Sequence, residues 1–240
     1  MSSLFTLNQD LNASALAAKF ARKNRVQIPN FFTNDTAQAI EAAMGDLDWQ
    51  LVLRSNEKHV DVFPPQMRDM GAARLADIQA YAQSRGAHDF AYLYYNHPIA
   101  DTVATGNLNN DILERVYQSM NDQAVLGFLK QVANLDADFC DMQATNYGPG
   151  HFLTRHDDGN PGKNRTFAYV YSLCQDWRAE WGGLLQFLDA AGNITDSFIP
   201  QYNTLSIFHV PQHHHVTQVS TFTPNPRLSL TGWFRTGSAG

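Results

Sequence analysis

The residue pattern changes near position 135, and this change limits the folds that the chain can adopt. Before it, apolar residues recur at helical spacing, and after it come short runs of β-branched and aromatic residues separated by Gly, Pro, Asn and Asp. The expected helices lie at 13–21, 37–44, 67–83, 111–120 and 124–133, and the expected strands at 166–173, 184–188, 204–208 and 228–234. We predict one domain over residues 1–240, mainly β with flanking helices (α+β). Residues 1–135 would give mainly helical support to a β-sandwich or barrel formed by residues 136–240.

Composition argues against several classes of protein. The formal net charge is −6 and the 17 Lys and Arg residues are scattered, which argues against nucleic acid as the main partner. No apolar run approaches the roughly 20 residues that a membrane-spanning helix needs. The N-terminus lacks the basic and apolar regions of a secretory signal, and two cysteines do not suffice for a disulfide framework. The simplest prediction is a soluble cytoplasmic protein with no membrane partner.

His156 and Asp158, together with a later run of three histidines, suggest a metal site. On one strand these two side chains would point to the same side, while Asp157 would point away. One histidine of the run 213–215 could complete a two-histidine, one-carboxylate triad, which leaves open positions on non-haem iron(II). The alternatives are a solvated histidine loop and a zinc site, since imidazole and carboxylate also bind zinc.

The last expected strand has one polar and one largely apolar face. Its polar positions are Arg227, Ser229, Thr231 and Trp233. An arginine inside a barrel is costly unless it is paired, and its planar guanidinium suits a carboxylate. Arg227 therefore predicts a dicarboxylic cosubstrate, unless it lies at a strand edge and makes a surface pair.

Several motifs occur in order between residues 138 and 234. They are Tyr-Gly-Pro-Gly at 147–150, His-Asp-Asp at 156–158, a Gly-Asn-Pro-Gly turn at 159–162 followed by Arg165, Trp-Gly-Gly-Leu-Leu at 181–185, His-His-Val at 214–216 and the strand 227–234. Together they resemble the prolyl 4-hydroxylase-like branch of the iron(II)- and 2-oxoglutarate-dependent oxygenases. Within that branch, the chain is most similar to the group that hydroxylates a proline in a ribosomal protein.

The resemblance implies a double-stranded β-helix (jelly-roll) fold with N-terminal helices packed against it. It implies that His156, Asp158 and His214 bind Fe(II) and that Arg227 binds the distal carboxylate of 2-oxoglutarate. Tyr147, Ser229 and Leu185 are further candidates for contacts to that cosubstrate. O2 would be the other cosubstrate, with ascorbate as an additional reductant. The implied activity is that of a dioxygenase which hydroxylates a prolyl residue of a protein or peptide, a ribosomal protein among the candidates, and releases succinate and CO2.

Some points stay open at this level. The segment between His214 and Arg227 is longer than is usual in the family, which keeps His213 and His215 as alternative ligands. The substrate could instead be a free amino acid or another small molecule, and a non-catalytic metal-binding sensor would use the same ligands. The aromatic run 92–95 could line a peptide groove or form a core strand, and residues 157–164 could close over substrate or form a hairpin turn. The sequence predicts no oligomeric state.

Overall fold

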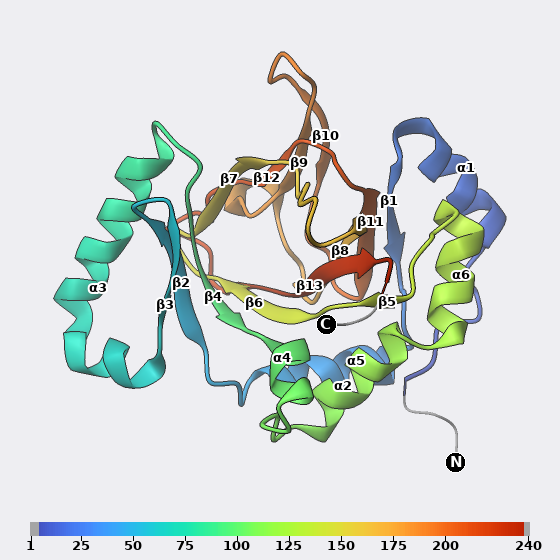
Figure 1. Ribbon diagram of the computed structural model, residues 1–240, viewed down its shortest axis with the longest axis horizontal. Helices are drawn as coiled ribbons and strands as arrows, with labels where there is room; N and C mark the ends of the chain where they lie inside the picture. Colours follow the sequence, from blue (N-terminus) through green and yellow to red (C-terminus); the bar gives the residue numbers. More distant parts are fainter. Residues whose placement is uncertain (1–4, 238–240) are drawn as a thin grey trace.

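The computed structural model, which describes residues 5–237, is built on one large antiparallel sheet that curls into a nearly closed barrel (Figure 1). The strands along the sheet are β1 (Arg25–Pro29), β11 (Thr204–His209), β8 (Arg165–Ser172), β13 (Arg227–Arg235), β6 (Gln143–Tyr147), β4 (Tyr92–His97), β7 (Phe152–His156), β12 (His214–Val216), β9 (Leu185–Leu188) and β10 (Ile194–Phe198). Off this path, β2 (Gln50–Ser55) pairs with β4, β3 (Lys58–Val62) pairs with β2, and β5 (Phe139–Cys140) pairs with β13. The predicted jelly-roll core is confirmed.

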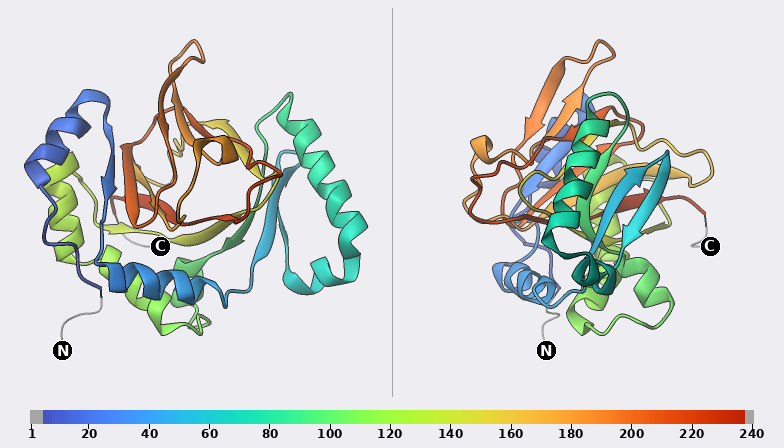
Figure 2. Two further views of the ribbon diagram at one scale, coloured as in Figure 1. Left: turned by 180° about the vertical axis from the view of Figure 1, so that it is seen from behind. Right: turned by 90° about the vertical axis from the view of Figure 1, so that its left-hand side faces the viewer.

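The helices lie outside the barrel (Figures 1 and 2). They are α1 (Ala13–Lys23), α2 (Asn34–Met44), α3 (Pro64–Gly86), α4 (Ile99–Ala104), α5 (Asp111–Met120) and α6 (Gln123–Ala133), with a 3-10 turn at Ala179–Trp181. Phe20 of α1 and Leu129 of α6 belong to one buried cluster with Tyr171 of β8 and Ile207 of β11. These helices therefore stabilise the sheet by covering its outer surface with apolar side chains. In the described part of the chain, no helix is both long and apolar enough to cross a bilayer.

The first 135 residues contain more than helices, because they also supply β1, β2, β3 and β4. The prediction of a mainly helical support was incomplete in this respect. The β2–β3 hairpin turns at Asn56 and Glu57, both with positive φ (48° and 64°). Such a two-residue turn usually carries a glycine, and without one the hairpin has no strong local signal.

Helix α3 covers the outer face of the β2–β4 strands. It is interrupted at Gly71, whose φ of 70° and ψ of 173° lie outside the helical region. Beyond this break, Leu75 and Ile78 pack on a buried cluster that includes Leu53 and Leu93. The opposite, inner face of these strands continues into the barrel, because Tyr92 of β4 pairs with Leu153 of β7.

Residues 157–164 do not form a hairpin turn. The strand before them, β7, pairs with β4 and β12, whereas the strand after them, β8, pairs with β11 and β13. The segment therefore crosses from one wall of the barrel to the other.

Candidate metal centre and adjoining cavity

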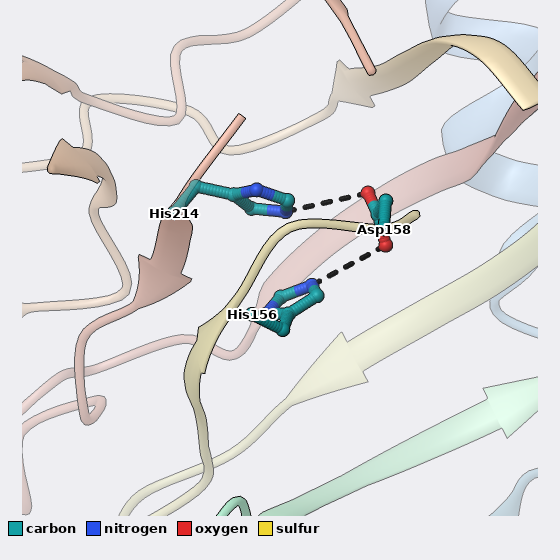
Figure 3. Close-up of side chains that lie close together, drawn as sticks. All are labelled: His156, Asp158 and His214. Atoms are coloured by element: carbon teal, nitrogen blue, oxygen red, sulfur yellow. Dashed lines mark ion pairs between the residues drawn. The ribbon is translucent and has the colours of Figure 1, made fainter. Parts of the chain in front are cut away.

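His156, Asp158 and His214 converge inside the barrel (Figure 3). His156 ends β7, and His214 begins β12 directly opposite it. The Nε2 atoms of His156 and His214 lie 3.4 Å from Oδ1 and Oδ2 of Asp158, respectively. All three potential ligand atoms lie within 4.8 Å of one another, and no fourth His, Cys, Asp or Glu of residues 5–237 joins the group.

Asp158 does not lie on the same strand as His156, so that prediction was wrong. Strand β7 ends at His156, and Asp158 follows in a left-handed backbone conformation with a φ of 62°. The turn, rather than strand alternation, brings the Asp158 carboxylate back to His156. The side chain of Asp157 is used locally instead, because its Oδ1 accepts a hydrogen bond from Gly159 N at 3.0 Å.

Arg165 holds this turn from the opposite wall of the barrel. Its Nη1 donates to the backbone oxygen of Asp158 at 3.3 Å. Its guanidinium lies 3.5 Å from the centre of the Trp233 ring, which is a favourable cation–π contact. Arg165 is therefore placed to stabilise an unusual backbone conformation at the carboxylate.

Of the three consecutive histidines, only His214 is directed at Asp158 in the described structure. His213 is exposed and precedes β12. His215 lies on the other face of the strand, where its Nε2 is 2.8 Å from Gln186 Oε1. Alternation along β12 therefore separates the three side chains.

Backbone carbonyls define the protonation of the two clustered imidazoles. Nδ1 of His156 is 3.0 Å from Thr154 O, and Nδ1 of His214 is 2.8 Å from Gln212 O. A carbonyl only accepts, so each Nδ1 carries the hydrogen, and in this tautomer Nε2 is the nitrogen that presents a lone pair. Two nitrogen lone pairs and a carboxylate that face one another form a suitable ligand set for a cation. Ligands at right angles around an ion with bonds of about 2.1 Å lie about 3 Å apart, close to the separations observed.

The electrostatic surroundings keep Asp158 and His214 in the protonation states that bind a metal ion. Burial raises the pKa of Asp158, but the neighbouring side chains of His156 and His214 outweigh this effect and lower the pKa to about 2. Burial, aided by the neighbouring His156, lowers the pKa of His214 to about 4. The carboxylate is thus ionised and the His214 imidazole neutral near pH 7.

A cavity of about 80 Å³ joins the three residues to Arg227. This space is large enough for several water molecules and is partly enclosed by Tyr94, Tyr147 and Leu185. Trp233 also lines it, and its Nε1 is buried without a hydrogen-bond partner among the described residues. The cavity is therefore a suitable place for a small polar ligand beside the metal.

Arg227 is a buried cation without an anionic partner in the described structure. Its side chain is 2% exposed, and no carboxylate of residues 5–237 lies within ion-pair distance. Nη1 donates to Ser229 Oγ at 3.1 Å, the guanidinium is 5.2 Å from the Tyr147 ring, and Nε has no partner. A buried, unpaired guanidinium is strongly unfavourable, so the site fits an anionic ligand.

Two glycines make room for this arrangement. Gly183 has a φ of 65°, and a Cβ there would lie 2.9 Å from Arg227 Cδ. Gly182 has a φ of 69°, and a Cβ there would overlap the carbonyl oxygen of Gln218. The Trp-Gly-Gly run is therefore needed for the close approach of this segment to β12 and Arg227.

The remaining candidate residues also lie at this cavity. Tyr147 and Leu185 line it, and Ser229 Oγ lies behind Arg227, 2.9 Å from Thr145 Oγ1. Sequence reasoning missed Thr145 and favoured a core strand over a peptide groove for the segment that contains Tyr94, which lines the cavity. The alternation of side chains along β4 could have placed Tyr94 correctly. Its neighbour Leu93 packs under α3, so Tyr94 points to the opposite face and lines the cavity.

Comparisons with known proteins agree with this geometry. Residues 142–235 match the model of the 2OG-Fe(II) oxygenase superfamily. The prolyl 3-hydroxylase OGFOD1 of Xenopus laevis is 30% identical over 115 residues, which are 45% of this chain. The match spans only 22% of that relative's length.

Three solved structures share the fold. A Pseudomonas putida prolyl-4-hydroxylase has a TM-score of 0.60 and 18% identity, over 95% of this chain and 100% of that one. A 2OG-Fe(II) oxygenase family oxidoreductase from Burkholderia pseudomallei has a TM-score of 0.62 and 17% identity, over 96% and 93%. A Trichoplax adhaerens prolyl hydroxylase, in complex with a peptide of the hypoxia inducible factor oxygen degradation domain, has a TM-score of 0.62 and 12% identity, over 93% and 88%.

Proposed function

We propose that this chain, whose residues 142–235 match the model of the 2OG-Fe(II) oxygenase superfamily, is such an oxygenase and hydroxylates a prolyl residue of a protein or peptide. The observation that carries the proposal is that the unpaired Arg227 shares one cavity with His156, Asp158 and His214. A metal-binding protein that uses the same three ligands without 2-oxoglutarate has no need for a buried cation there. We take residues 1–240 as one such domain.

In this proposal, His156, Asp158 and His214 hold Fe(II), and Arg227 binds the distal carboxylate of 2-oxoglutarate. Iron(II) held there with 2-oxoglutarate and O2 supplies the oxidation of a substrate C–H bond, with release of succinate and CO2. Ser229 orients the Arg227 guanidinium through its 3.1 Å hydrogen bond. Tyr147 and Leu185 exclude water from the cosubstrate, which strengthens its pairing with Arg227.

The proposed substrate class rests on the relatives. OGFOD1 is named a prolyl 3-hydroxylase, and two of the similar structures are prolyl hydroxylases, one with a bound peptide. The motifs that resemble the enzymes acting on a ribosomal protein make such a protein the first candidate. Both cysteines are buried free thiols, which fits the proposed location in the reducing cytoplasm.

The test is to supply Fe(II), 2-oxoglutarate, ascorbate and proline-containing peptides and to measure succinate and hydroxylated peptide by mass spectrometry. Free proline is supplied in parallel, and Arg227→Gln serves as the matched variant. We expect hydroxylated peptide, with much less product from the variant. Product from free proline alone would contradict the peptide substrate. A folded, iron-loaded protein that forms no succinate with either would contradict the enzyme.

A further inference from the structure

A line of aromatic side chains runs from the cavity to the protein surface. Tyr147 and Tyr94 line the cavity, and their rings are stacked with centres 4.7 Å apart and planes at 12°. The Tyr94 and Tyr92 ring centres are 5.8 Å apart. The Tyr92 hydroxyl is 2.7 Å from His59 Nδ1, and the His59 side chain is 51% exposed. Four side chains thus connect the buried site with solvent.

The line stays on one face of the sheet. Across the adjacent strands β4, β2 and β3, Tyr94 pairs with Val52 and Val52 pairs with Asp61 (Figure 1). Directly paired residues point to the same side. The intervening Leu93 and Leu53 pack under α3 on the opposite side. The tyrosines therefore occupy the face that α3 leaves uncovered.

The outer end of the line is a tyrosine that donates to a base. His59 Nε2 is 3.0 Å from Asp61 Oδ1, which also accepts from Gln50 Nε2 at 3.0 Å. An ionised carboxylate only accepts, so His59 Nε2 carries a hydrogen. His59 Nδ1 is then the acceptor for the Tyr92 hydroxyl, and Asp61 stabilises the ring when it takes up a proton.

Other buried tyrosines lack such a partner. Tyr169 donates to the backbone oxygen of Asp141, and Tyr171 donates to Asn203 Oδ1. Neither oxygen takes up a proton near neutral pH. Among the tyrosines of residues 5–237, Tyr92 is the one whose hydroxyl makes a hydrogen bond with an imidazole. A phenol loses an electron far more readily when its proton moves to a base at the same time.

We infer that Tyr147, Tyr94 and Tyr92, ending on His59 and Asp61, carry oxidising equivalents from the cavity to the surface when no substrate is bound. The inference rests on the proposed function, which supplies the oxidant, an iron site oxidised by O2. One electron passes from Tyr92 through the Tyr94 and Tyr147 rings to the iron site, which is reduced by one electron. The Tyr92 O–H bond breaks, its proton moves to His59 Nδ1, and Tyr92 is left as a neutral phenoxyl radical.

A reductant at the surface restores Tyr92, and a second electron that passes along the same line, with protons taken up from solvent, would return the iron site to iron(II). A small ene-diol such as ascorbate donates one electron to the Tyr92 radical, and His59 returns the proton, which restores the phenol. The exposed edge of His59 makes this end reachable from solvent. A purely structural aromatic wall needs neither the imidazole acceptor nor its carboxylate.

The first arm of the test starts the reaction with iron(II), 2-oxoglutarate and O2 in the absence of substrate. Phenoxyl radical is measured by freeze-quench EPR, and oxidised residues are mapped by peptide mass spectrometry. In Tyr92→Phe and His59→Gln, we expect several-fold less radical and several-fold more oxidation of Tyr94. Tyr95→Phe is the control, because Tyr95 packs with the α3 cluster on the other face. Equal radical yield and equal damage in all variants would overturn the inference.

The second arm needs no iron and so separates this inference from the proposed function. A soluble ruthenium photo-oxidant is applied to the metal-free protein, and the radical is trapped and located by mass spectrometry. We expect Tyr92 to be the preferred site in the wild type and this preference to vanish in His59→Gln. Equal trapping at Tyr92 and at exposed Tyr81 in both proteins would overturn the route. If the protein formed no complex with iron(II) and 2-oxoglutarate in the first arm, that result would count against the proposed function and not against this inference.

Discussion

Asp158 shows how a single backbone conformation builds the candidate metal centre. A left-handed conformation costs a typical residue other than glycine about 1–2 kcal/mol, although aspartate and asparagine adopt it more readily than most. At Asp158, the hydrogen bond from Arg165 to the backbone oxygen offsets part of this cost. The sequence motif correctly predicted that Asp158 belongs to the cluster. Strand alternation was the wrong reason, because a turn directly after a strand leaves no periodic pattern in the sequence.

The two adjacent aspartates differ in their predicted effects on metal binding. Asp158→Ala removes the only carboxylate of the cluster, so we expect no stoichiometric iron(II) binding. Asp157→Ala loses one local hydrogen bond to Gly159 and should retain the metal. Anaerobic iron(II) titration of both variants checks this, and equal behaviour would contradict the assignment of Asp158.

Arg165 should act on the metal through Asp158. Arg165→Met keeps an apolar side chain against Trp233 but removes the donor to the Asp158 carbonyl. We expect iron(II) or cobalt(II) affinity to fall by roughly 10–100-fold, with partial recovery in Arg165→Lys. Calorimetric titration measures this. If both variants lost thermal stability but kept wild-type metal affinity, the role of Arg165 would be structural only.

At the scale of elements, local signals predicted five of the six described helices, with the short α4 missed, and long-range pairing decided the strands. Helices α5 and α6 were predicted to within one residue, and in the structure the side-chain oxygens of Asn110 and Asp122 cap them. Strand β1 was missed, because its five residues pair with β11 about 180 positions later in the chain. No local pattern encodes such a partner.

The glycine pair before β9 should be intolerant of side chains. Gly182 has a φ of 69° and a ψ of −150°, a region open almost only to glycine, and a Cβ would overlap the Gln218 carbonyl. We expect Gly182→Ala to lower the free energy of unfolding by about 3 kcal/mol or more. Gly127→Ala is the control, because a Cβ in that helical position meets nothing within 4 Å. It should be neutral or stabilise by up to about 1 kcal/mol. Urea unfolding compares them, and similar effects of the two changes would contradict the packing described.

At the scale of the molecule, barrel closure creates the cavity. Its walls come from residues as distant as Tyr94 and Trp233, and the sequence alone did not show that these two side chains would meet. The motif order predicted, through resemblance, the jelly roll and the clustering of His156, Asp158 and His214. The aromatic line from Tyr147 to His59 could not be foreseen, because the β2–β3 hairpin was not predicted.

Global stability should fall in mild acid through His151. This side chain is 5% exposed, and burial lowers its pKa to about 4, although a hydrogen bond to the Asn146 backbone opposes the shift. In the unfolded chain its pKa is about 6.5, so between these values only the unfolded state takes up a proton. The free energy of unfolding should therefore drop by about 2 kcal/mol between pH 7 and pH 5 from this residue.

His151→Gln removes that titration. The pH dependence of urea unfolding should be shallower in the variant than in the wild type by this amount. The comparison isolates His151, because the other histidines remain in both proteins. An unchanged pH dependence would mean that His151 is not held neutral in the folded state.

The most direct test of the proposed site is an anaerobic titration with iron(II) and 2-oxoglutarate, followed by the visible metal-to-ligand charge-transfer band. We predict one iron and one 2-oxoglutarate per chain, loss of the band in His214→Ala but not in His213→Ala, and a roughly 100-fold weaker response to 2-oxoglutarate in Arg227→Gln. A folded wild-type protein without this band, or a band lost in His213→Ala and kept in His214→Ala, would contradict the account.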